Sequence, residues 1–385
     1  MRTLLPLFFF LVACAGTPRT PSGPLDVCAV DAPTTAWMQR WFDAWRLTQR
    51  DILKVGPQGA PPMVLFDARC VWTTSDTVAP AGRQQPGPAL GDTPLRWRTA
   101  AHHGHLSLPH GKRVPVQLMS FAAPAEQGGE GFFVMAAPSV WEQARVTSDL
   151  GLEKLLVAVF LHEMTHTRQF YAFLPRMDAL TQKWALPDDL NDDAVQERFS
   201  GTPEYVAAYH QERDLLFAAA AASTAPESRA LASQALALMK QRHAQWFTGA
   251  DERYRELDSV FLTLEGIGQW AAYQWTRHPL GGGVEPTEAL KGIRRGGTWW
   301  SQDEGLALCL VLDRLLPTWT NLAFAPEPLE VPALLERALG NAGPPSGHHH
   351  VPADVVARAS PRRPGAKHHH QKLVVPMVDA ASVRR

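Results

Sequence analysis

A His-Glu-Met-Thr-His pentapeptide, residues 162–166, lies inside an apolar stretch of the chain and restricts how the chain can fold. The preceding residues 152–161 are almost all apolar, and the pattern predicts a buried helix over 149–174, capped by Ser148 and ended by Pro175. Two imidazoles and a carboxylate are costly to bury without partners. The fold must therefore supply such partners at this point of the helix.

The spacing of the two histidines points to a metal ion. At helical pitch His162 and His166 lie one turn apart on the same face, so both imidazoles can reach one zinc ion at about 2.0 to 2.1 Å. Glu163 lies beside them without being a ligand, and its carboxylate is suited to take a proton from water and pass it to a leaving amine. We expect one Zn²⁺ per chain, with both histidines as ligands and Glu163 as the catalytic base.

A catalytic zinc site needs a third protein ligand. No further histidine follows the pentapeptide at metal-binding spacing, so this ligand must come from another helix. Glu265 is the first candidate, because Gly266 and Gly268 remove side-chain bulk beside it and allow close packing against the histidine helix. Glu212 is the alternative ligand. Glu204 is better explained as a charge that complements a helix N-terminus.

The same segments resemble the gluzincin metallopeptidases. Members of that family pair HExxH with a later Glu-Gly segment, and residues 265–268, Glu-Gly-Ile-Gly, are similar to it. Residues 162–169 are also similar to the HExTHxxQ variant found in some bacterial members. The resemblance implies a small sheet before the histidine helix, with an edge strand that pairs with an extended peptide substrate.

The reaction also needs a donor for developing negative charge, and metal ligands need partners that orient them. Tyrosine and histidine side chains of the predicted helices are the candidate donors: Tyr273, Tyr254, Tyr209 and His210. Glu212 and His210 are also candidates for orienting a ligand histidine, and Gln169 is a candidate for either role. The sequence does not choose among them.

The first residues of the chain resemble the signal of a bacterial lipoprotein. Their apolar segment is too short to span a bilayer, and residues 11–14, Leu-Val-Ala-Cys, match the lipobox. The resemblance implies a signal peptide over 1–13, an acylated Cys14 and a tether over 14–33. Because alanine follows the cysteine, where aspartate would favour another destination, we expect an anchor in the outer membrane of the bacterial envelope, facing the periplasm.

Charge and cysteine content limit the partners and the compartment. The 37 basic and 38 acidic side chains nearly balance, so we expect no nucleic-acid partner. Cys28 and Cys70 are candidates for a disulfide, which fits an oxidising compartment. Cys309 lies in an apolar run that favours a buried thiol.

Short apolar runs broken by Gly and Pro predict a small mixed or antiparallel sheet in the first part of the chain. A helix over 34–53, with a tryptophan at every fourth position, comes first and is expected to pack in the core. Strands are expected at 64–66, 114–121 and 131–135, with 131–137 as the edge strand.

The rest of the chain is predicted to be helical, so the fold class is α+β, mainly α-helical, with a zincin-like core. Helices are expected at 203–223, 226–247, 251–278, 302–316 and 331–339, in addition to the histidine helix. We expect one domain over 34–342, composed of 34–147 and a helical lobe over 148–342, and a disordered tail over 343–385.

These patterns lead us to expect a zinc-dependent peptidase that hydrolyses peptide or protein substrates and is held at the membrane by its lipid. A zinc amidase acting on cell-wall peptides is one alternative. A non-catalytic envelope lipoprotein stabilised by zinc is another, although a purely structural zinc site has no need of a base such as Glu163. A helical binding lipoprotein without a metal is the third.

Overall fold

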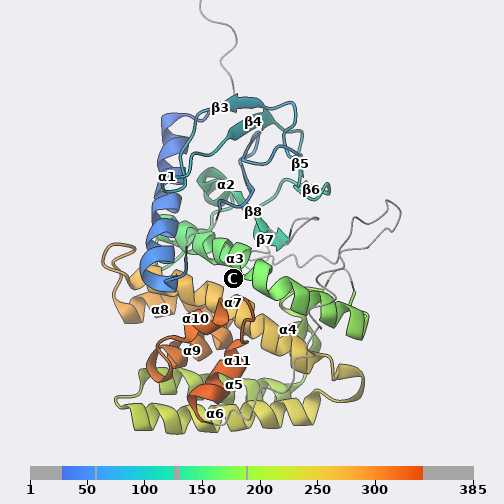
Figure 1. Ribbon diagram of the computed structural model, residues 1–385, viewed down its shortest axis with the longest axis vertical. Coiled ribbons are helices and arrows are strands. Elements are labelled where there is room, and N and C mark those ends of the chain that lie inside the picture. The colour runs from blue at the N-terminus through green and yellow to red at the C-terminus, as the bar shows by residue number, and fades with distance from the viewer. Residues whose placement is uncertain (1–27, 57–58, 125–130, 188–189, 341–385) are drawn as a thin grey trace, which may run out of the picture.

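The structure, a computed structural model, describes residues 28–56, 59–124, 131–187 and 190–340. In Figure 1 the sheet and helix α1 form the upper part, and a body of helices forms the lower part. The chain is α+β and mainly helical, as predicted. The expected signal peptide, Cys14, most of the tether and the expected tail lie outside the described residues. Within the described part, no helix is both long enough and apolar enough to cross a membrane.

Six strands form the main sheet, in the spatial order β3-β4-β2-β1-β8-β7. Their bounds are β1 Met63–Phe66, β2 Cys70–Thr73, β3 Arg83–Gln85, β4 Trp97–Ala101, β7 Ser120–Pro124 and β8 Gly131–Ala136. Strands β1 and β8 run parallel, and the other neighbouring pairs are antiparallel. A second sheet pairs β5 His105–Ser107 with β6 Arg113–Pro115.

The strand order corrects two expectations. Residues 131–137 are not the edge, because β8 lies between β1 and β7 and is buried along its length; among the described strands, β7 forms that edge. Continuous burial is what a strand with neighbours on both sides requires. The expected strand 114–121 is divided between β6, in the second sheet, and β7.

Helix α1, Ala32–Leu47, packs its tryptophans between the sheet and the helical body. Trp41 stacks on Phe160 of the histidine helix, with ring centres 5.3 Å apart. Trp37 meets Trp72 of β2 edge-on at 6.3 Å. The expected core role of these tryptophans is confirmed, since all of them are buried.

A π-helical segment follows α1, and a disulfide holds the residues that precede it. The expected helix 34–53 continues beyond α1 as a π-helical segment, Thr48–Leu53. Cys28 and Cys70 form a disulfide that ties the residues before α1 to β2, in line with the sequence prediction. Cys309 is a buried free thiol.

Helix α3, Leu152–Trp184, carries the histidine pentapeptide and crosses the centre of the molecule in Figure 1. Its N-cap is Gly151, not the expected Ser148. The Ser148 hydroxyl instead accepts a hydrogen bond from the Leu150 N–H at 3.1 Å, in the turn that leads into the helix.

The expectation that α3 ends at Pro175 is wrong. Pro175 removes one helical N–H, but tertiary contacts beyond it hold the helix together. Leu180 is fully buried, and Arg176 donates to Glu256 of α7 at 2.9 Å and to Glu330 at 3.1 Å. These contacts outweigh the single lost backbone bond.

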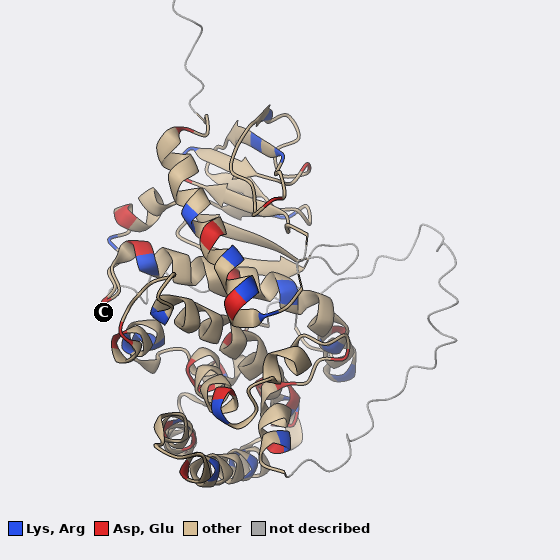
Figure 2. Cartoon of the chain, turned by 60° about the vertical axis from the view of Figure 1, so that its left-hand side comes forward, with Lys and Arg blue, Asp and Glu red and all other residues tan. Residues whose placement is uncertain are grey.

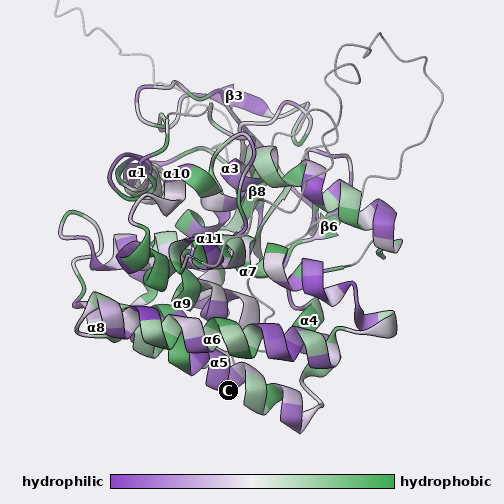
Figure 3. Cartoon of the chain, turned by 60° about the horizontal axis from the view of Figure 1, so that its bottom comes forward, coloured by the Kyte–Doolittle hydropathy of each residue, from purple (hydrophilic) through white to green (hydrophobic). Residues whose placement is uncertain are grey.

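The helical body surrounds α7, which lies directly below α3 in Figure 1. The helix bounds are α2 Pro138–Gln143, α4 Ala194–Phe199, α5 Pro203–Ala221, α6 Ala225–Trp246, α7 Tyr254–Arg277, α8 Pro286–Arg294, α9 Trp300–Leu315, α10 Trp319–Ala323 and α11 Val331–Ala338. Helices α2, α4, α8 and α10 were not predicted. Basic and acidic residues are interspersed over the outer helices (Figure 2), and hydrophilic and hydrophobic residues alternate along α6 (Figure 3).

Candidate metal centre

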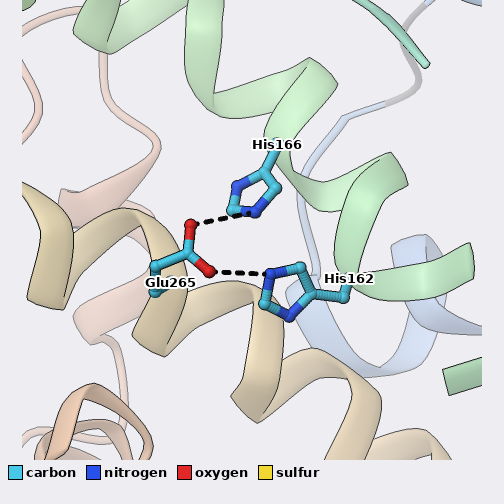
Figure 4. Close-up of side chains that lie close together, drawn as sticks. All are labelled: His162, His166 and Glu265. Carbon is cyan, nitrogen blue, oxygen red and sulfur yellow. Dashed lines mark hydrogen bonds and ion pairs between the residues drawn. The ribbon is translucent and has the colours of Figure 1, made fainter. Parts of the chain in front are cut away.

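Three side chains converge in the interface between α3 and α7, as Figure 4 shows. His162 and His166 project from successive turns of α3, and Glu265 projects from α7. The distances from the Glu265 oxygens are 3.1 Å to His162 Nε2 and 3.3 Å to His166 Nε2. Two bonds of about 2.0 to 2.1 Å at a tetrahedral angle place ligand atoms about 3.3 Å apart, so this spacing fits one zinc-sized ion.

Glycines in α7 allow these helices to approach closely. A methyl group at Gly268 would lie 3.0 Å from the His162 ring, so any side chain there would press on the imidazole. Gly266 has a different role from the one expected: a methyl group there would lie 2.5 Å from the backbone of Gly305 in α9. Gly268 therefore serves the α3 contact, and Gly266 serves the α9 contact.

Both imidazoles donate to glutamine side chains through Nδ1. Gln169 Oε1 lies 2.7 Å from His166 Nδ1, and Gln269 Oε1 lies 3.1 Å from His162 Nδ1. The nitrogen of each amide donates to a backbone carbonyl: Gln169 Nε2 to that of Leu264, and Gln269 Nε2 to that of Ile293. Because a carbonyl only accepts, the amide orientations are fixed, and each Nδ1 must carry the proton.

The Nε2 atoms are thereby left as lone-pair donors that face a carboxylate. His166 is fully buried, and burial lowers its pKa to about 4, so its ring is neutral near pH 7. Its Nε2 and Glu265 Oε1 have no hydrogen-bond partner among the described residues. Two acceptors 3.3 Å apart repel each other unless a cation lies between them. The donor set and its burial therefore fit a divalent metal.

Glu163 lies beside this group with one free oxygen. Its Oε1 is 3.4 Å from the Ser120 hydroxyl of β7, and the backbone of Ala122 also contributes a hydrogen bond. Its Oε2 is buried and has no partner in the described part of the chain. Burial, and then the charge of Glu265, raise the Glu163 pKa well above its ordinary value. A buried carboxyl group with a raised pKa is a candidate for proton transfer.

Glu265 is itself oriented by a neighbouring amide. Gln302 of α9 donates to Glu265 Oε2 at 3.3 Å. Burial alone would raise the Glu265 pKa, yet this pKa is lowered below its ordinary value, and the hydrogen bond from the Gln302 amide is one of the contributions that lower it. Glu265 is therefore ionised, as a metal ligand must be.

Two more carboxyl groups lie near Glu265, and no motif in the sequence points to them. Asp192 follows helix α3 in the sequence and is only 3% exposed. Among the described residues, Asp192 Oδ1 and Asp193 Oδ1 are buried without a hydrogen-bond partner. Burial and the charge of Glu265 raise the pKa of both groups, that of Asp193 to about 7.

Glu212, the alternative ligand, lies elsewhere. Its carboxylate accepts two hydrogen bonds from Arg242, at 2.8 and 3.0 Å, in a buried network between α5, α6 and α7. Asp258 and Tyr205 also contact the guanidinium, at 3.1 and 2.6 Å, and Glu304 lies 3.6 Å from it. Glu212 is thus the counter-charge of a buried arginine. Its assignment as the alternative third ligand is not supported.

The other side chains considered for the reaction are spread over the helical body. Tyr209 donates its hydroxyl to the Trp300 carbonyl at 3.2 Å, so that donor is committed. His210 is exposed, and Tyr254 packs in an aromatic cluster at the start of α7. Tyr273 is buried on α7, two turns beyond Glu265. Gln269 was missed, although its place one turn after Glu265 mirrors that of Gln169 after His166.

Comparison with protein-family models, curated proteins and solved structures finds no match to this chain. The functional interpretation therefore depends on the chemistry of the site.

Proposed function

We propose that this chain is a zinc-dependent peptidase of the gluzincin type. The observation that carries the proposal is a set of buried histidine nitrogen and carboxylate oxygen atoms that face one another at the spacing of ligands of a single ion. His166 Nε2 and Glu265 Oε1 are the clearest pair, at 3.3 Å. Two nitrogen ligands and one carboxylate in tetrahedral spacing favour zinc over magnesium and calcium, which prefer oxygen ligands.

In this proposal, three residues hold the ion and a fourth transfers a proton. His162, His166 and Glu265 would hold the zinc, which when bound polarises a substrate carbonyl and makes water easier to deprotonate. Glu163 accepts the proton at its unpartnered Oε2 and returns it to the leaving amine. Its raised pKa suits the first step, because it makes the ionised carboxylate a stronger proton acceptor.

Strand β7 is the surface that would position the substrate backbone. It is an edge of the main sheet in the described part of the chain, and an extended peptide can add to such an edge. Ser120 and Ala122 of this strand both contact the Glu163 carboxylate. A peptide that follows β7 would therefore pass beside the base.

The same proposal places the domain in the bacterial envelope. The lipobox ending at Cys14 would attach the chain to the outer membrane through a lipid, with the domain in the periplasm. The Cys28–Cys70 disulfide supports an oxidising compartment. Peptides and proteins of that compartment are the expected substrates.

The test compares Glu163→Gln with Glu153→Gln, a matched change at an exposed ion pair on the same helix. The wild type and both variants should bind about one zinc per chain, measured by elemental analysis. Hydrolysis of a mixed peptide library should fall by about 10² to 10⁴-fold in Glu163→Gln only. Retained hydrolysis in that variant would remove the assigned base.

Purified cell wall, tested in parallel, separates the peptidase from the amidase alternative. Turnover of cell wall without turnover of any linear peptide would replace the peptidase by the amidase. A wild-type chain that binds zinc but hydrolyses neither substrate would favour the non-catalytic lipoprotein.

A further inference from the structure

The two glutamines beside the ligand histidines connect different helices. Gln169 lies on α3 with His166, and its amide nitrogen donates to the Leu264 carbonyl of α7 at 3.1 Å. That carbonyl immediately precedes Glu265. One amide therefore links the ring of one ligand to the backbone beside another.

Gln269 makes the complementary connection from α7. Its oxygen accepts from His162 Nδ1 of α3, and its nitrogen donates to the Ile293 carbonyl of α8 at 2.7 Å. Both glutamines are almost fully buried. Neither end of either amide is free to turn toward solvent.

An amide suits these positions better than the carboxylate that often supports a ligand histidine. A carboxylate would accept from Nδ1 but would repel the carbonyl of Leu264 or Ile293, because both atoms are acceptors. It would also add negative charge beside Glu163, Glu265 and Asp192, which are already buried together. Glutamine holds the ring without adding charge.

We propose that Gln169 and Gln269 are positioning residues that keep the proton of each ligand imidazole on Nδ1 before a metal binds. The benefit to metal binding rests on the proposed function, whereas the proton position is a property of the metal-free chain. Without Gln269, the His162 proton would move to Nε2, where Glu265 Oε2 lies 3.1 Å away and accepts it. That proton would occupy the place of the ion, and the metal would have to displace it.

The experiment measures the proton positions and the zinc affinity separately. ¹⁵N spectra of metal-free protein, labelled at histidine, distinguish a protonated Nδ1 from a protonated Nε2. In the wild type, Nδ1 of His162 and of His166 should carry the proton. Gln269→Met, which retains bulk but has no acceptor oxygen, should shift the His162 proton to Nε2, and Gln169→Met should do the same for His166.

Zinc affinity, measured by competition with a chelator, should fall by about 10 to 100-fold in each of these variants. Gln274→Met is the matched control, since Gln274 lies on the same helix but donates to Asp313. It should change neither readout. Unchanged proton positions and affinity in both Gln169→Met and Gln269→Met would overturn the inference.

The outcomes separate this inference from the proposed function. A wild type with both protons on Nδ1 but no zinc binding would refute the metallopeptidase and leave the positioning role intact. Zinc binding that neither glutamine substitution changes would refute the positioning role and leave the metallopeptidase proposal intact. If Gln269→Met does not fold, Gln269→Glu replaces it: the acceptor remains, so the His162 proton should stay on Nδ1, and its transfer to Nε2 would overturn the inference.

Discussion

Gly268→Ala tests the geometry of the metal centre with the smallest available change. The added methyl group would lie 3.0 Å from two atoms of the His162 ring and 3.1 Å from a third. Ordinary contacts of such a carbon begin at 3.4 Å, so the ring or the helix must yield by about 0.4 Å, the difference between these distances. Metal–ligand distances tolerate only about 0.2 Å.

The change should therefore weaken metal binding more than it weakens the fold. We expect zinc affinity to fall by about 10 to 100-fold, which is about 1.4 to 2.7 kcal/mol. For the metal-free chain, alanine gains about 1 kcal/mol of helix propensity, which offsets much of an overpacking cost of about 1 to 3 kcal/mol. The two free energies thus separate a site effect from a folding effect.

Chelator competition gives the affinity, and urea unfolding in EDTA gives the stability of the metal-free chain. Gly201→Ala is the control, because a methyl group there would meet nothing within 4 Å. It should leave both values unchanged. Wild-type zinc affinity in Gly268→Ala would refute the argument that His162 is held at its place by this close contact.

Two further predictions concern buried charges. Arg242→Met should lower the free energy of unfolding by about 3 to 5 kcal/mol, since Glu212 and other buried acids lose their counter-charge; a loss below about 1 kcal/mol in urea titrations would contradict this. In EDTA, stability should fall as pH rises from about 4 to about 7, because the Asp193 pKa is raised from 3.8 to about 7 and the folded chain holds more protons than the unfolded chain in that window. Asp193→Asn should reduce this slope, and an unchanged slope would show that Asp193 does not cause it.

Sequence patterns located the histidine helix and its acidic partner because both signals are local. The HExxH spacing depends on one helical turn, and Glu265 was distinguished by the glycines beside it. The strand order could not be predicted from local signals. β8 pairs with β1 across a separation of about 70 residues, and no local alternation reports such a parallel neighbour.

Long-range contacts also explain the remaining differences. Pro175 is a sound signal for a helix end, but the ion pairs of Arg176 extend α3 beyond it. Gln269 has no motif of its own, and its role depends on His162 lying opposite. Nothing in the local sequence reports the burial of Asp192, because that burial depends on packing near Glu265, which lies on a distant helix.

The separation of the ligands along the chain has a thermodynamic consequence. His162 and Glu265 are 103 positions apart, so an ion that contacts both joins segments that an unfolded chain holds far from each other. Such an ion binds the folded state almost exclusively, and each tenfold rise in its free concentration above Kd adds about 1.4 kcal/mol to the free energy of unfolding. A melting temperature measured for this protein therefore has meaning only beside a stated activity of the free ion.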